Sequence, residues 1–173
     1  MKKAVTLIEL TMAIALMGVV VLGVASFDVG SRRFLQSSER STQVLNEATL
    51  IMDRISKDAL TAVGRVNAAA ITVAGNTVTI NQDTNNDGVV DTVVSYSLAG
   101  NQLTRAAGAN VEVLTNRATG FAVGNQIGNT VPVVLTLVFD VALPRNTVQE
   151  RAANNNPQVQ VQSNMEVPGW SLS

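Results

Sequence analysis

The sequence contains no cysteine and no histidine. The lack of cysteine excludes disulfides and thiolate nucleophiles, and the two absences together remove the usual protein ligands of zinc, haem and iron–sulfur centres. General acid–base chemistry would fall to carboxylates and lysines alone, so we expect no enzyme. Aromatic residues make up only 3% of the 173 residues, and no basic run is longer than two residues. We therefore expect no direct nucleic-acid binding.

Charged residues make up only 14% of the chain and are almost missing near its N-terminus. Residues 10–27 contain no charge at all, and Glu9 is the one charged residue just before them. At 1.5 Å per residue, a helix over residues 5–27 would be roughly 35 Å long, enough to cross a bilayer core. Lys2 and Lys3 precede this segment and predict a cytoplasmic N-terminus, with the rest of the chain outside the membrane.

A cleavable secretory signal is the alternative interpretation of this segment. The small residues Gly23-Val24-Ala25 would suit a signal peptidase. The apolar stretch is longer than a usual signal core, however, and Glu9 interrupts its beginning. These features favour a helix that stays in the membrane.

Glu9 is the most informative residue of the apolar segment. An ionised acid in a bilayer costs on the order of 2.5–3.5 kcal/mol, so Glu9 needs a partner or a peripheral position. Thr6-Leu7-Ile8-Glu9 matches a capping box, in which the first and fourth residues satisfy each other's backbone amides at a helix N-terminus. The pattern predicts that Thr6 and Glu9 begin the helix, and it leaves open a second role for Glu9 in assembly.

The string Ala4-Val5-Thr6-Leu7-Ile8-Glu9-Leu10, behind a short basic leader and ahead of an apolar helix, resembles the class III signal of type IV pilins and pseudopilins. The resemblance implies that a prepilin peptidase cuts between Ala4 and Val5 and methylates the new amine of Val5. It also implies that Glu9 pairs with the N-terminal amine of a neighbouring subunit in a filament, with Thr6 beside it. Ala4 stands where glycine is usual and Val5 where phenylalanine is usual, and these departures bear on cleavage efficiency.

After Phe27 the sequence becomes amphipathic, and no proline interrupts residues 5–63. We expect one helix over this range, ending at Gly64. The apolar side recurs at spacings of three and four residues and consists of Val44, Ala48, Ile51, Ile55, Ala59 and Ala62, widened by Leu45, Met52 and Leu60. Charges at Glu39, Arg40, Glu47, Asp53, Arg54, Lys57 and Asp58 are expected mostly on the opposite, solvated side.

From Ala70 onward the hydrophobic period changes from that of a helix to that of a strand. Ile71 and Val73 face Val78 and Ile80 across Ala74-Gly75-Asn76, which predicts a hairpin. We expect further strands over residues 89–98, 102–105, 133–143 and 158–167, with 133–143 central and 158–167 at an edge. Asn154-Asn155-Asn156-Pro157 predicts an exposed loop.

Together these patterns predict an α+β fold, and the resemblance implies a pilin-like one, with a long N-terminal helix packed on an antiparallel sheet. The expected organisation is a leader over residues 1–4, a transmembrane and assembly helix over 5–27, an amphipathic helix over 28–63 that packs on the head, and a β-rich head over 64–173. Within the family, Asp83 to Arg105 is similar to the PilW/GspJ group. That likeness implies a minor or priming subunit.

One segment of the head is a candidate calcium loop. Asp83, Asn85, Asp87 and Asp91 place side-chain oxygens close together in sequence, and the carbonyl of Val89 could complete the set. The glutamate that ends an EF-hand loop is missing, and no helices are predicted on either side. A solvated turn between two strands is the alternative, because Asp, Asn and Gly are common in turns.

The resemblance implies a structural subunit of a type IV pilus or of a type II secretion-like pseudopilus. Its partners would be other pilin or pseudopilin subunits, the prepilin peptidase, the inner-membrane assembly platform and the lipid bilayer. It would begin as a single-pass inner-membrane protein and end in a surface pilus or a periplasmic pseudopilus. A major pilin of the same filament, or a membrane-tethered surface binding module that never polymerises, are the alternatives.

Overall fold

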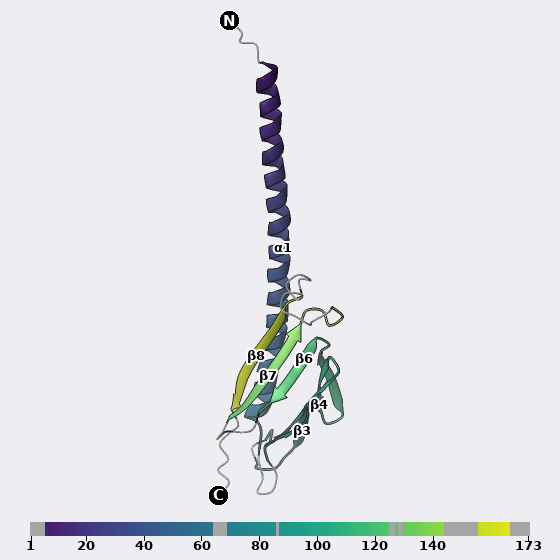
Figure 1. The fold of residues 1–173 in the computed structure, drawn as a ribbon. Helices are drawn as coiled ribbons and strands as arrows, with labels where there is room; N and C mark the ends of the chain where they lie inside the picture. Colours follow the sequence, from purple (N-terminus) through teal and green to yellow (C-terminus); the bar gives the residue numbers. More distant parts are fainter. Residues whose placement is uncertain are drawn as a thin grey trace. The chain divides into compact units, whose positions relative to one another are not determined.

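The computed structural model describes residues 6–63, 69–85, 87–124, 127, 130–143 and 156–166. Within them, one long helix, α1 (Leu7–Leu60), precedes eight β-strands (Figure 1). The chain divides into two units, residues 1–39 and 40–173, and α1 contributes to both. The prediction of an α+β fold with a long N-terminal helix and antiparallel strands is confirmed.

The first five strands form an antiparallel sheet in sequence order. They are β1 (Ile71–Ala74), β2 (Thr77–Gln82), β3 (Thr92–Ala99), β4 (Gln102–Ala107) and β5 (Asn110–Thr115). The predicted hairpin joins β1 to β2, and its two-residue loop begins at Gly75, whose φ of 60° favours glycine. The β3–β4 loop begins in the same way at Gly100, with a φ of 61°.

The other three strands form a second antiparallel sheet, in the order β6 (Ala118–Val123), β7 (Thr130–Val138) and β8 (Gln158–Glu166). The prediction that the apolar strand near residue 133 is central and that the strand from Gln158 lies at an edge is confirmed. The strands of the head thus form two antiparallel sheets, a division that the sequence analysis did not specify. The sequence prediction also missed β5 and β6 altogether.

Two predicted strand boundaries and one predicted exposure were wrong for local reasons. β3 begins at Thr92 instead of Val89, because the residues before it belong to the acidic loop described below. β7 ends at Val138 instead of Leu143, because the next two amides donate to the Pro157 carbonyl and the Asn156 side chain, which precede β8. Asn156 was predicted in an exposed loop but is fully buried, and its side chain bonds both backbone groups of Asp140 at 2.8 Å. Asn154 and Asn155 lie outside the described residues.

α1 ends at Leu60, three residues earlier than predicted. Beyond it the backbone joins the five-stranded sheet: Ala62 forms a bridge with Gln82, and the Val63 amide donates to the Asn81 carbonyl at 2.7 Å. The chain therefore leaves the helix because strand pairing takes over its backbone groups. The predicted stop at Gly64 lies outside the described residues.

One hydrophobic core joins the amphipathic part of α1 to the inner faces of both sheets. The helix contributes Val44, Ala48, Ile51, Met52, Ile55 and Ala59, as the helical period predicts. Leu45 and Leu60 were predicted to widen this stripe, but they are 47% and 57% exposed. The strands contribute mainly Val78, Ile80, Val94, Tyr96, Leu103, Phe121, Val133, Leu135, Leu137 and Met165.

Candidate functional sites

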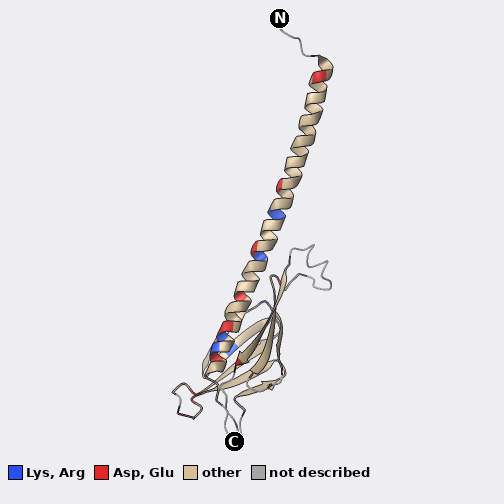
Figure 2. Cartoon of the chain, turned by 90° about the vertical axis from the view of Figure 1, so that its left-hand side faces the viewer, with Lys and Arg blue, Asp and Glu red and all other residues tan. Residues whose placement is uncertain are grey.

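The N-terminal half of α1 is apolar and exposed. Each large apolar side chain from Leu7 to Phe27 is at least 55% exposed. Figure 2 shows the long stretch of this helix that carries no charged residue. By length and composition, α1 can cross a membrane, either as a membrane span or as a signal anchor.

The capping box at the start of α1 is confirmed. The backbone amide of Thr6 donates to the Glu9 carboxylate at 2.9 Å, and the Glu9 amide donates to the Thr6 hydroxyl oxygen at 3.4 Å. The Thr6 hydroxyl also donates to the same carboxylate oxygen at 3.0 Å. Glu9 thus has a local partner within a single chain, while Ala4 and Val5 lie outside the described residues.

The candidate calcium loop is closed by hydrogen bonds from its own backbone. The carboxylate of Asp83 is buried and accepts the amides of Asp87 at 3.2 Å and Gly88 at 2.7 Å. Asn85 accepts the Asp87 amide at 3.0 Å, and Asp87 in turn accepts the Val89 amide at 2.7 Å. These residues therefore form successive side-chain-to-backbone turns.

Asp91 closes the far side of the loop. Its carboxylate accepts both the hydroxyl of Thr84, at 2.8 Å, and the Thr84 amide, at 3.0 Å. These hydrogen bonds lower the pKa of Asp91 below its ordinary value. In the described part of the loop, no three acidic side chains come together as a metal site. Calcium binding by Asp83, Asn85, Asp87, Val89 and Asp91 stays a prediction.

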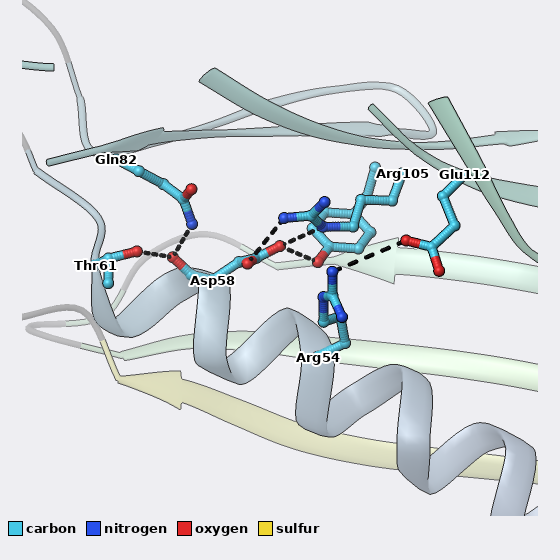
Figure 3. Close-up of polar contacts among 7 residues, drawn as sticks. Arg54, Asp58, Thr61, Gln82, Arg105 and Glu112 are labelled. Carbon is cyan, nitrogen blue, oxygen red and sulfur yellow. Dashed lines mark hydrogen bonds and ion pairs between the residues drawn. The ribbon is translucent and has the colours of Figure 1, made fainter. Parts of the chain in front are cut away.

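A largely buried ion pair, which the sequence prediction missed, ties α1 to the five-stranded sheet (Figure 3). The guanidinium of Arg105 on β4 donates to both carboxylate oxygens of Asp58, at 2.7 and 3.1 Å. Tyr96 on β3 donates its hydroxyl to the same carboxylate. Nearby, the Gln82 side chain donates to the Asp58 carbonyl at 2.9 Å, which caps the end of the helix.

The partners of Asp58 decide its charge state. Burial raises the pKa of Asp58, but the hydrogen bonds from Arg105 and Tyr96 and the charge of Arg105 outweigh it, so the pKa lies below its ordinary value. Burial and the neighbouring carboxylate raise the pKa of Tyr96, and the bond to Asp58 raises that of Arg105. Asp58 is therefore ionised at neutral pH, while Tyr96 keeps its proton.

A second cluster ties α1 to the segment between β5 and β6. Glu47 accepts a hydrogen bond from Arg117 at 3.1 Å and another from the Thr115 hydroxyl. The Arg117 guanidinium also lies 5.0 Å from the ring centroid of Phe139, and that of Arg40 lies 4.9 Å from it. Glu47 and Asp58 were both predicted on the solvated side of α1. Their spacing was the available signal, because Glu47 follows Val44 by three residues and Asp58 follows Ile55 by three.

A groove of about 380 Å³ lies between α1 and β5. Its lining is partly apolar and partly charged, and consists of Glu47, Leu50, Ile51, Asp53, Arg54, Lys57, Glu112, Val113 and Leu114. Every charged side chain of this lining is ion-paired: Arg54 meets Glu112 at 3.9 Å, Lys57 meets Asp53 at 2.7 Å, and Glu47 meets Arg117.

Three features thus stand out: an exposed apolar helix with an acidic N-terminal cap, a hydrogen-bonded acidic loop, and two polar clusters that join the helix to the head. Comparisons with protein-family models, with curated proteins and with solved structures find no match to this chain.

Proposed function

We propose that this protein is a membrane-inserted structural subunit of a type IV pilus or of a type II secretion-like pseudopilus. The observation that carries the proposal is the exposed apolar half of α1 with a carboxylate, Glu9, in its first turn. A helix this apolar needs lipid or other helices around it. A filament subunit would have both in turn: lipid surrounds the helix before assembly, and the helices of neighbouring subunits surround it afterwards.

In this proposal Glu9 has two successive partners. Within a single chain the capping box satisfies it, at 2.9 Å from the Thr6 amide. During assembly it would pair with the N-terminal amine of the next subunit, at Val5 after prepilin-peptidase cleavage behind Ala4. A low-dielectric helix bundle strengthens that charge pair, because nothing there screens it. The loop likeness to the PilW/GspJ group favours a minor, priming subunit.

Filament incorporation of Glu9 variants tests the proposal. We expect Glu9→Ala and Glu9→Lys to insert into the membrane but to be missing from sheared filaments. Glu39→Ala is the matched control, because it removes an exposed acid from the same helix. Thr6→Ala removes the capping hydroxyl and keeps the carboxylate, so we expect it to reduce incorporation less than the Glu9 variants do. Normal incorporation of both Glu9 variants would overturn the assembly role.

The mass of the mature protein is an independent test. Cleavage and methylation predict a chain that begins at Val5 and carries one additional methyl group on its amine. A chain that begins at Ser26 would mean a cleaved secretory signal. An intact N-terminus in a cell with an active prepilin peptidase would favour a membrane-tethered surface module. Copy number per filament then separates a minor subunit from a major one.

A further inference from the structure

The edge strands of the two sheets differ in how they are protected against pairing with other chains. Natural edges are usually short, bulged, charged or interrupted by proline. β1 is only four residues long. β5 and β6 each contain one extra residue where their pairing shifts, Leu114 and Thr119 respectively. Such bulges twist an edge away from a flat partner.

β8 as the structure describes it has none of these protections before Glu166 at its end. It pairs with β7 over nine consecutive residues, Gln158 to Glu166, without a shift in register. From Gln158 to Met165 it contains no charged residue and no proline. The side of β8 that faces away from β7 has no partner strand among the residues that the structure describes (Figure 1). β8 is therefore a long, regular edge without charge up to Met165, and alternate backbone donors and acceptors on it have no partner among the described residues.

The side chains of β8 are also incompletely covered. On the inner face, Val159 and Val161 pack against the core but are only partly buried. On the outer face, Gln158, Gln160, Gln162 and Asn164 are exposed. One more strand beside β8 would cover the two valines and place further side chains beside this row of amides.

We propose that the open edge of β8 binds an extended segment of a partner polypeptide, which becomes a fourth strand of the β6–β7–β8 sheet. The backbone of β8 selects an extended chain, because only such a chain can satisfy donors and acceptors repeated along a strand. Val159 and Val161 select apolar residues at alternate positions, and the amides on the other face select uncharged polar ones. Glu166 favours a basic residue at its end of the partner strand. The proposal does not depend on filament assembly.

Amide hydrogen exchange of the full chain in detergent micelles tests this proposal. The probe is a capped synthetic peptide with the sequence of residues 158–166, which has the required alternation. Before addition, alternate amides of β8 should exchange fast, because they donate to no group in the part of the chain that the structure describes. At a peptide concentration about ten times its Kd, their exchange should slow about tenfold, since binding depletes the free edge by that factor. The amides of β1 and β5 should not change.

Two controls distinguish strand addition from other binding. The same peptide with alternate amides N-methylated keeps its side chains but loses its donors, and it should give no protection. The variant Gln162→Lys, at an exposed position, should reject a peptide whose central glutamine is replaced by lysine and accept one with glutamate there. The proposal is overturned if alternate β8 amides are already protected without peptide, if peptide leaves them fast, or if the N-methylated peptide protects equally well.

Discussion

Removal of the Asp58 carboxylate should destabilise the head by about 3 kcal/mol. The side chains of Asp58 and Arg105 are only 12% and 14% exposed. Asp58→Ala would leave the guanidinium of Arg105 and the hydroxyl of Tyr96 without their shared acceptor. Loss of one partner from a buried pair costs about 3–5 kcal/mol, and the residual exposure lets water offset part of that. Hence we expect a value near the lower end of the range.

Asp53→Ala is the matched control, because it removes the same group from the same helix. Asp53 pairs with Lys57 at 2.7 Å, but their side chains are 57% and 68% exposed. An exposed pair of this kind contributes less than about 0.5 kcal/mol. The assay is urea unfolding of the full chain in detergent micelles, followed by the circular dichroism of the sheets. The double variant Asp58→Ala/Arg105→Ala should cost about 1–3 kcal/mol less than the sum of the single variants.

The pH dependence gives a second measure of the same contact. The pKa of Asp58 is lowered in the folded state, against about 3.9 for an unfolded aspartate. A lowered pKa means that the stabilisation is fully present above the unfolded value and is lost as pH falls through the folded value. Asp58→Asn should therefore flatten the loss of stability below about pH 4. Equal costs for Asp58→Ala and Asp53→Ala, or additive effects in the double variant, would refute the reasoning.

Two further changes probe the loops of the head. Asn156→Ala removes the side chain that bonds both backbone groups of Asp140 at 2.8 Å. The melting temperature should therefore fall by the equivalent of about 1–3 kcal/mol of unfolding free energy. Asn156→Asp should keep the bond from the Asp140 amide and lose the bond to the Asp140 carbonyl. Calcium at millimolar concentration should raise the melting temperature of the full chain, and Asp91→Asn should abolish the rise. An unchanged melting temperature of the unmodified chain would remove the calcium site and leave a hydrogen-bonded turn.

The features predictable from sequence are those that depend on local periodicity. The apolar segment, the capping box at Thr6 and Glu9, and the first hairpin each follow from residues close together in the chain. β5 and β6 were missed for different reasons. β5 contains an alternation at Val111 and Val113, so its own sequence does carry a strand signal. β6 contains Gly120 and two alanines, so its strand character comes from pairing with β7 instead of from its own propensity.

The ion pairs between α1 and the head could not be predicted from a pattern that sorts residues only into apolar and polar. Such a pattern assigns every acid to the solvated side of a helix. Asp58 lies on the buried side because Arg105 and Tyr96 come to the same place, and those residues are 47 and 38 positions away in sequence. Only the pairing of β3 with β4 brings Tyr96 and Arg105 opposite one another. The site therefore depends on sheet register, which the sequence of the helix does not contain.

The two ion pairs at Glu47 and Asp58 also explain how the packed part of α1 keeps one position on the head. Its apolar stripe contains Ala48 and Ala59, small residues that tolerate a slide along the helix axis. Glu47 and Asp58 are eleven residues apart, about 16 Å along the axis. Each holds an arginine at about 3 Å, and a shift of one residue, roughly 1.5 Å along the axis with about 100° of rotation, would break both contacts at once. Burial of the stripe thus supplies most of the stabilisation, whereas the two acids select the register in which it packs.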